Sequence, residues 1–300
     1  MPQYNSYISQ FLKIHKKPAL LCIVGPTGSG KTKLSLEIAK QYNGEIINAD
    51  SKQVYKNIEI TSGQIPKEEQ ENISHHLFGY IDPSITYTVM DHCNDALSCI
   101  QEIHKQNKLP ILTGGTGLFI NALTQNFDLP SQSLSAEIRK ELEEKDNDTL
   151  WEELLKVDPE YTKITHKNNR VRVIRALEVF LSTGEKKSEI SRSEEIFDVL
   201  ILMPEIKSRE DLYEKINARA KEIWNSGTIK EAQNLLERVS EKKLEKTLPA
   251  LTAIGIPEAF DYLENKTTEE EAIEKMQQKS RNYAKRQMTW WRKDSRVILI

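Results

Sequence analysis

The chain has 300 residues, of which 38 % are hydrophobic and 29 % are charged, and its net charge is −3. This composition is typical of a soluble globular protein of one large or two modest domains. The sequence has no apolar run of about 18 residues and no secretory leader, so we expect a cytoplasmic protein that does not associate with membranes. Three scattered cysteines argue against a disulfide framework, and the histidines lack the spacing of a metal cluster.

Short apolar runs alternate with helical patterns over roughly the first 125 residues. We expect strands at Leu20–Val24, Glu45–Asn48 and Pro110–Thr113. We expect helices at Lys31–Tyr42, Val89–Gln106 and Thr116–Leu123. Such alternation predicts an α/β fold with a parallel sheet flanked by helices.

The pattern changes beyond Asn126. From Ser135 to about Thr183 it is almost entirely helical, and strand character returns at Phe197–Met203. Later helices are expected at Arg209–Asn225, Ile229–Val239 and Thr268–Arg292, and Arg296–Ile300 could close the sheet. The sequence therefore predicts an α/β core (1–126 and 195–300, with a helical C-terminal part) and an all-helical insertion (127–194). A separate all-helical C-terminal domain is the alternative division.

The stretch GPTGSGKT fits the phosphate-binding pattern G-x-x-x-x-G-K-[ST]. Its residues are Gly25, Pro26, Thr27, Gly28, Ser29, Gly30, Lys31 and Thr32. An apolar run precedes it and a helical pattern follows it, which is the context that a phosphate loop needs. Backbone N–H groups there would cradle an anion, with Lys31 as a point charge and Thr32 as a ligand for Mg²⁺.

Asp50 follows the second expected strand and should lie near the phosphate loop, because ligands bind at the carboxyl ends of parallel strands. Three roles remain open: a carboxylate beside Mg²⁺, a general base on an acceptor substrate, or a cap for the backbone of Lys52 or Gln53. The third strand ends in Thr-Gly-Gly-Thr (113–116) without a carboxylate, and no Asn-Lys-x-Asp motif is present. The loop is therefore more typical of a transferase than of a nucleotide hydrolase.

Two segments are basic and contain no acidic residue. Residues 163–175 carry five Lys or Arg, and residues 275–293 carry seven. On a chain of nearly neutral charge, two such segments are a weak indication of a polyanionic partner.

Taken in order, six segments resemble the tRNA dimethylallyltransferases, which modify adenosine 37. They are GPTGSGKT (25–32), NADSKQVYKNIEIT (48–61), HHLFGYIDP (75–83), LPILTGGTGLFINAL (109–123), NNRVRVIRALEVF (168–180) and KRQMTWWR (285–292). They span nearly the whole chain, whereas residues 60–66 and 253–258 depart from the family pattern.

The resemblance implies transfer of a dimethylallyl group from dimethylallyl diphosphate to N6 of adenosine 37 in the anticodon stem-loop of tRNA, with release of diphosphate. It implies Mg²⁺ as the cofactor, and we expect a monomer. Asp50 would be the base, Arg219 would meet the diphosphate charge, and Thr27 would contact the reaction centre. The implied tRNA-binding residues are Asp50, Ser51, Lys52, Gln53, Thr116, Asn169, Arg170, Val171, Arg172, Val173, Lys285 and Arg286.

Two other functions fit part of the sequence. A small-molecule kinase would also have a phosphate loop, an acceptor-side Asp50 and an arginine-bearing lid. A non-catalytic RNA-binding protein would explain the basic segments but would give the phosphate loop and Asp50 no role.

Overall fold

The computed structural model describes residues 4–125, 136–189 and 194–300. Contacts along the chain divide it into two compact units. The core unit contains residues 1–124 and 196–300, and the insertion unit contains residues 125–195. The helical C-terminal part therefore packs in the same unit as the phosphate loop.

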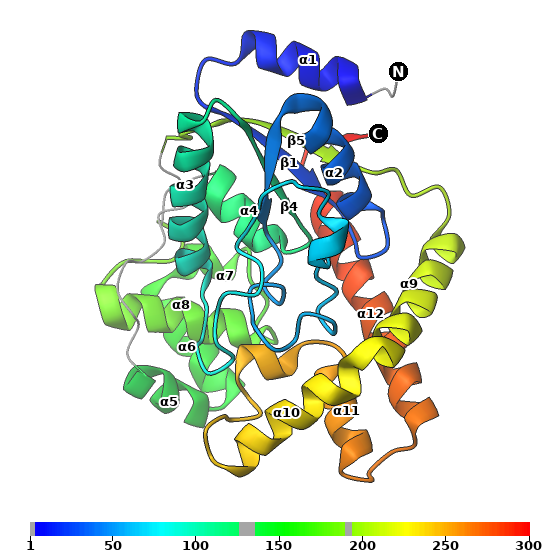
Figure 1. Ribbon diagram of the computed structural model, residues 1–300. Helices are drawn as coiled ribbons and strands as arrows, with labels where there is room; N and C mark the ends of the chain where they lie inside the picture. Colours follow the sequence, from blue (N-terminus) through cyan, green and yellow to red (C-terminus); the bar gives the residue numbers. More distant parts are fainter. Residues whose placement is uncertain (1–3, 126–135, 190–193) are drawn as a thin grey trace. The chain divides into compact units, whose positions relative to one another are not determined.

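A six-stranded sheet lies at the centre of the core unit (Figure 1). Its strand order is β3-β2-β4-β1-β5-β6, and every neighbouring pair is parallel. The strands are β1 (Ala19–Val24), β2 (Gly44–Asn48), β3 (His75–His76), β4 (Leu109–Gly114), β5 (Asp198–Met203) and β6 (Val297–Leu299). The predicted parallel α/β sheet is thus confirmed, including its closing strand at the C-terminus. Among the described strands only β3, which has two residues, was not predicted.

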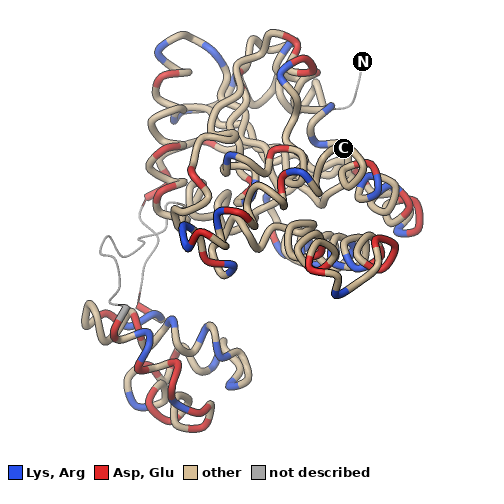
Figure 2. Tube along the Cα trace, turned by 60° about the horizontal axis from the view of Figure 1, so that its bottom comes forward, with Lys and Arg blue, Asp and Glu red and all other residues tan. Residues whose placement is uncertain are grey.

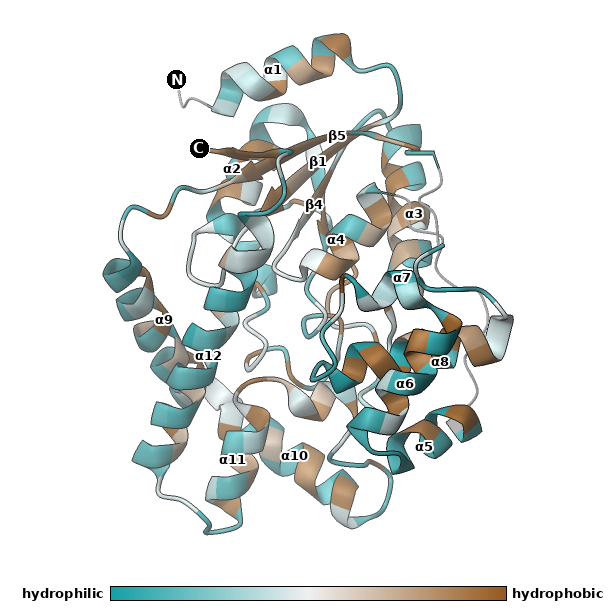
Figure 3. Ribbon diagram, turned by 180° about the vertical axis from the view of Figure 1, so that it is seen from behind, coloured by the Kyte–Doolittle hydropathy of each residue, from teal (hydrophilic) through white to brown (hydrophobic). Residues whose placement is uncertain are grey.

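The register places the middle of β1 between its neighbours, with Cys22 opposite Leu112 on β4 and Ile201 on β5. All six β1 residues are buried. The central strands β1, β4 and β5 are accordingly hydrophobic along their length (Figure 3). Strands covered on both faces need continuous apolar sequence, which is why these runs were recognisable.

Helices surround the sheet and form the C-terminal part of the core unit. They are α1 (Tyr4–Ile14), α2 (Lys31–Tyr42), α3 (Val89–Lys105), α4 (Gly117–Thr124), α9 (Arg209–Ile223), α10 (Ile229–Ser240), α11 (Ile256–Leu263) and α12 (Glu269–Trp291). Capping boxes at Thr88 and Thr268 start α3 and α12, the two longest of these helices. Of the eight, α1 and α11 were not predicted. None of the described helices has the length and apolar character needed to cross a bilayer.

A second apolar core joins the segment after β2 to the C-terminal helices. Tyr55 and Ile58 are fully buried there, together with Trp224 and Ile256. A π-helical turn, Trp224–Thr228, links α9 to α10, and short 3-10 turns occur at Lys67–Glu69 and Pro249–Thr252. This packing fixes the loop that follows Asp50.

The insertion unit contains α5 (Ala136–Glu144), α6 (Asn147–Val157), α7 (Pro159–Thr162) and α8 (Arg170–Thr183), with no strand among its described residues. Leu142, Leu150, Leu154, Ile174 and Leu177 are among its buried core residues. Both units contain acidic and basic residues, in agreement with the small net charge of the chain (Figure 2).

Candidate functional site

The phosphate loop, residues 25–32, runs from the end of β1 to the start of α2. Gly25 and Gly28 have φ angles of 134° and 81°, which glycine adopts far more easily than other residues. A Cβ on Gly28 would lie 3.2 Å from Ile216, so α9 packs closely on the loop. This geometry leaves backbone N–H groups at the N-terminus of α2, where an anion is favoured.

Two side chains of the loop suit an anionic ligand. Nζ of Lys31 donates a hydrogen bond to the carbonyl of Pro26 at 2.8 Å. Burial lowers the pKa of Lys31 to about 8, an effect that Asp50 opposes and Arg219 reinforces. The hydroxyl of Ser29 is buried and finds no hydrogen-bond partner within the part of the chain that the structure describes, which is costly unless a ligand supplies one.

Asp50 is held in a tight turn directly after β2. Its Oδ1 accepts the N–H of Lys52 at 2.9 Å, so the predicted capping role is present. The Asn48 side chain holds the Asp50 backbone, because its Oδ1 accepts the Asp50 N–H at 2.8 Å and its Nδ2 donates to the Asp50 carbonyl at 3.1 Å. Oδ2 of Asp50 has no hydrogen bond to any described residue and remains free to accept a proton.

The side chains of Lys52 and Gln53 bind other parts of the protein. Nζ of Lys52 donates to the carbonyl of Pro249 at 2.6 Å and to Oγ1 of Thr252 at 2.9 Å. Nε2 of Gln53 donates to the carbonyls of Ser62 and Gly63, both at 3.1 Å. Burial also lowers the pKa of Lys52. These two side chains hold the loop that surrounds Asp50 and do not project freely toward a nucleotide.

Thr116, at the start of α4, lies beside the Asp50 loop. Its Oγ1 accepts the N–H of Ser51 at 3.0 Å, and its own N–H donates to the carbonyl of Ala49 at 3.2 Å. The loops that end β2 and β4 are therefore joined at the carboxyl edge of the sheet, as expected for parallel strands.

Arg219 reaches this region from α9. Its Nη2 donates to the carbonyl of Gly63 at 3.1 Å, while its side chain stays largely exposed. Arg219 and Asp50 both change the pKa of Lys31, so the three charges lie within electrostatic reach of one another. Arg219 is thus placed at the phosphate loop and is not an isolated surface charge.

Two residues of α12 belong to the site but were not predicted. Gln287 is buried and contacts both the phosphate loop and the loop after β4. Tyr283 lies one turn earlier, where burial and the Asp50 charge raise the pKa of its hydroxyl. The four-residue spacing of Tyr283, Gln287 and the buried Trp291 along a basic helix was the one available signal.

The remaining predicted residues of α12 are exposed. Lys285 and Arg286 are both exposed, and the guanidinium carbon of Arg286 lies 5.5 Å from the centroid of the Tyr283 ring. Trp291 is a core residue, whereas Trp290 is 37 % exposed and packs closely enough on Gly117 that a Cβ there would clash.

The predicted RNA-binding residues of the insertion unit differ in their surroundings. Val173 was predicted to bind tRNA, but it is 1 % exposed in the core of the unit, so its side chain packs inside that unit. Arg170 donates to the carbonyls of Glu143 and Lys145 and therefore caps the end of α5. Asn169, Val171 and Arg172 are exposed.

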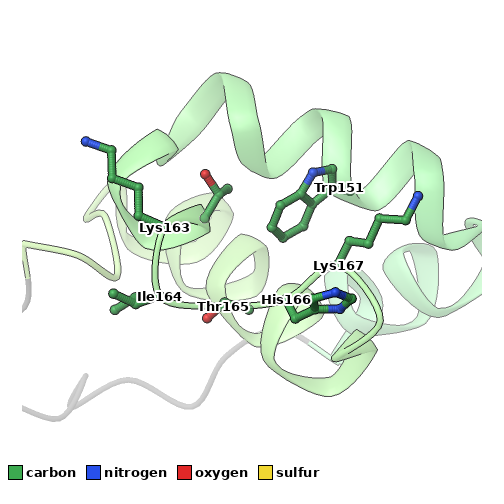
Figure 4. A pocket seen from close by; sticks show the side chains of 7 residues that line it. Trp151, Lys163, Ile164, Thr165, His166 and Lys167 are labelled. Carbon is green, nitrogen blue, oxygen red and sulfur yellow. The ribbon is translucent and has the colours of Figure 1, made fainter.

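A hollow on the insertion unit is lined by Trp151, Thr162, Lys163, Ile164, Thr165, His166 and Lys167 (Figure 4). Both lysines form ion pairs with acidic neighbours, Lys163 with Glu160 at 2.6 Å and Lys167 with Asp148 at 3.1 Å. The hollow carries none of the groups that converge on the phosphate loop.

The loop fits a magnesium ion that arrives with a phosphorylated substrate. Thr32 is exposed at the start of α2 and makes no side-chain hydrogen bond to the described residues. Mg²⁺ typically combines one or two protein oxygens with substrate phosphates. No group of three or more His, Cys, Asp or Glu among the described residues could hold a metal by itself.

Comparison with known proteins agrees with this geometry. The family described as IPP transferase matches residues 53–294. The chain is 40 % identical to a tRNA dimethylallyltransferase of Halalkalibacterium halodurans, over 94 % of this chain and 90 % of that protein. It is also 40 % identical to one from Acetivibrio thermocellus, over 94 % and 91 %.

Solved structures give the same result. A tRNA isopentenylpyrophosphate transferase from Bacillus halodurans aligns with a TM-score of 0.69 at 38 % identity, covering 95 % of this chain and 90 % of that one. A eukaryotic dimethylallyltransferase whose structure was determined acting on tRNA aligns with a TM-score of 0.80 at 32 % identity, covering 91 % of this chain and 69 % of that one.

Proposed function

This chain belongs to the IPP transferase family, and we propose on that basis that it is a tRNA dimethylallyltransferase that alkylates N6 of adenosine 37. The observation that carries the assignment to this site is the packing of α9 on the phosphate loop at Gly28, with Arg219 of that helix bound to the Gly63 carbonyl and Lys31, Asp50 and Arg219 within electrostatic reach of one another. It unites an anion cradle with a carboxylate that can accept a proton, which is what transfer from a diphosphate to an amine requires.

The donor is dimethylallyl diphosphate, with its diphosphate in the phosphate loop. As the C–O bond breaks, negative charge grows on the bridging oxygen and leaves with diphosphate. Lys31, Arg219 and the loop N–H groups stabilise that charge, and the Ser29 hydroxyl gains the partner that it lacks in the free protein. The Thr27 side chain contacts the reaction centre.

Thr32 would hold Mg²⁺ against the diphosphate. When bound, the ion supplies positive charge to the leaving group. Asp50 is not assigned to the metal, because its Oδ1 already caps the turn.

The acceptor is the exocyclic amine of adenine, a poor nucleophile whose lone pair is delocalised into the ring. Oδ2 of Asp50 accepts the N6 proton as the N–C bond forms. Ser51 and Thr116 line the same loop pair and are proposed contacts of the adenine. The base must leave its stack in the anticodon loop to reach this site, at a cost of a few kcal/mol.

We propose that exposed side chains bind the tRNA stem. The basic ones are Arg172 in the insertion unit and Lys285 and Arg286 on α12, and Asn169 and Val171 lie beside Arg172. Lys52 and Gln53 act on the tRNA through the loop that they hold. Arg170 serves mainly to cap α5.

We further propose that the enzyme acts as a monomer in the cytoplasm. The three cysteines are free, as expected in a reducing compartment. Size-exclusion chromatography with light scattering measures the oligomeric state, and a dimeric mass would contradict the monomer.

One assay tests the reaction against the kinase alternative. The protein is incubated with bulk tRNA and labelled dimethylallyl diphosphate, and separately with tRNA or small acceptors and γ-labelled ATP. We expect label in tRNA from the first donor and none from the second. Transfer from ATP alone would identify a kinase.

A further inference from the structure

Gln287 is a buried side chain that joins two loops of the core unit. It is 4 % exposed and lies on α12. Its Oε1 accepts the backbone N–H of Thr27 in the phosphate loop at 3.0 Å. Its Nε2 donates to the carbonyl of Gly115, in the loop after β4, at 3.1 Å. Both ends of one amide are therefore used, and each end holds a different loop.

The surroundings of Gln287 leave little freedom for either loop. A Cβ on Gly115 would lie 1.9 Å from Nε2 of Gln287, so glycine is the residue that permits this contact. A Cβ on the preceding Gly114 would lie 2.2 Å from the carbonyl oxygen of Ala49. The loop after β4 is thus confined between the end of β2 on one side and α12 on the other.

The two joined loops have different partners in the reaction. Thr27 belongs to the loop that holds the diphosphate, whereas Gly115 precedes Thr116, whose hydroxyl accepts the N–H of Ser51 next to Asp50. The hydrogen bond to Oε1 of Gln287 occupies the backbone N–H of Thr27, and therefore this N–H does not bind the diphosphate. Pairing of β1 with β4 brings the two loops together, and the Gln287 side chain then links the loop that holds the diphosphate to the loop beside Asp50.

We propose that Gln287 is a positioning residue that fixes the donor carbon relative to the acceptor amine. The inference rests on the proposed function, and it adds a residue to which that function assigned no role. Gln287 acts through the backbone of Thr27 and Gly115 and does not touch the reacting atoms. Misplacement by about 1 Å can cost roughly 10² in rate.

The first variant removes both hydrogen bonds while keeping the shape. Gln287→Met has a similar length and fills the same buried space, but leaves the Thr27 N–H and the Gly115 carbonyl without partners. We expect kcat to fall about 10²-fold, with KM for the donor and for tRNA within about threefold. A residue needed only for folding would instead lower the amount of active enzyme and the midpoint of thermal unfolding together.

The second variant makes the contact dependent on pH. In Gln287→Glu the carboxylate can accept from Thr27 but faces the Gly115 carbonyl, which repels it. The protonated acid restores the donor, so it reproduces the glutamine pattern. Burial raises the pKa of this carboxyl, and the ratio of variant to wild-type kcat should rise as the pH falls from about 8 to about 5.5.

Tyr283 on α12 is the titratable group that is hydrogen-bonded to Gln287, and the charges of Asp50 and Arg286 act on Tyr283. These groups are present in Gln287→Glu and in the wild-type protein, and therefore their titration largely cancels in the ratio of the two kcat values. The matched control is Gln101→Glu, the same change at an exposed position near the C-terminal end of α3. The ratio of the kcat of Gln101→Glu to the wild-type kcat should stay constant with pH.

Amide hydrogen exchange of Thr27 tests the contact without using activity. We expect the N–H to be protected in the wild-type protein and to exchange faster in Gln287→Met. An unprotected Thr27 in the wild type, a wild-type kcat in Gln287→Met, or a pH-independent ratio for Gln287→Glu would each overturn the inference. A wild-type protein that protects Thr27 but transfers no label would instead reject the proposed function.

Discussion

We predicted phosphate binding at two places, the phosphate loop of the core unit and the basic segment of the insertion unit, but the two are built differently. In the loop, backbone N–H groups form the cradle, and the hydroxyl of Ser29 has no hydrogen-bond partner among the described residues. In the insertion unit, the cationic side chains of Lys163 and Lys167 are already paired with acids, and Arg170 caps a helix.

The two regions show why phosphate binding can be predicted from sequence more directly for the loop than for the basic segment. A cradle made of backbone depends on glycines and a helix start that are adjacent in sequence. The use of a basic side chain depends on acids and carbonyls that are distant in sequence. Arg170, for example, binds the carbonyl of Lys145 across 25 residues. A run of positive charge therefore locates a segment but does not say which of its side chains are free.

The largest expected effect concerns Asp50, the proposed general base beside the phosphate loop. In Asp50→Asn the amide can still cap the turn but cannot take the N6 proton as a carboxylate does. The chemical step should slow by about 10²–10⁴. Single-turnover rates with prebound tRNA measure it.

Donor binding is the control for Asp50→Asn. Calorimetry should find the affinity for dimethylallyl diphosphate preserved. If Asp50→Asn abolishes Mg²⁺-dependent donor binding and leaves tRNA affinity intact, Asp50 lies on the metal side and another residue is the base.

The second prediction concerns the charge of Lys31. Its pKa in the free protein is lowered to about 8, whereas a bound diphosphate favours the charged form and raises the pKa in the complex. The donor should therefore bind with its full affinity below about pH 8, and its association constant should fall by up to about tenfold per pH unit above that. Titration calorimetry between about pH 6.5 and pH 9.5 measures the change.

Lys31→Ala is the partner experiment, since it removes the titrating group. It should lower the transfer rate by about 10² or more and leave donor affinity nearly constant across the same pH range. Equal pH dependence in both proteins would assign the titration to another group, and a wild-type rate in Lys31→Ala would contradict the donor assignment.

Much of the core unit could be predicted from sequence because its determinants are local. Buried parallel strands such as Ala19–Val24 need continuous apolar sequence, and the phosphate loop needs its glycines in order. The edge strand His75–His76 has two polar residues and exists only through pairing with β2, so no periodic pattern could reveal it.

The site could be predicted only in part, because several of its contacts are long-range. Asp50 was found from its place after a strand. Gln287 was missed, because a polar residue inside a basic amphipathic helix looks exposed until its two partners, 260 and 172 residues away, are known. Val173 was predicted from the resemblance to bind tRNA, yet it is buried, because helical geometry turns every third or fourth residue toward the core.

The third prediction tests whether Arg170 is structural. Arg170→Ala removes hydrogen bonds to the carbonyls of Glu143 and Lys145 and to Oδ1 of Asn147. The insertion unit should lose about 1–2 kcal/mol of stability, measured by amide exchange in α5 of the full-length protein. Unchanged exchange would mean that Arg170 is not needed to hold α5 and is free to bind RNA. The basic segment would then differ less from the phosphate loop than we infer.

The smallest expected effect belongs to Arg172, which is exposed and has no side-chain partner among the described residues. It lies two positions after Arg170 on the same helix, so the two variants form a matched pair. Arg172→Ala should leave exchange in α5 unchanged and weaken tRNA binding, with the slope of log K against log salt reduced by about 0.7–0.9 for one lost phosphate contact. Fluorescence anisotropy with labelled tRNA at several salt concentrations measures that slope, and donor affinity should not change. The two substitutions thus separate stability from binding within one helix. If Arg172→Ala keeps the wild-type slope, this face of α8 does not contact the RNA backbone, and the basic segment of the insertion unit would serve to pair with its own acids.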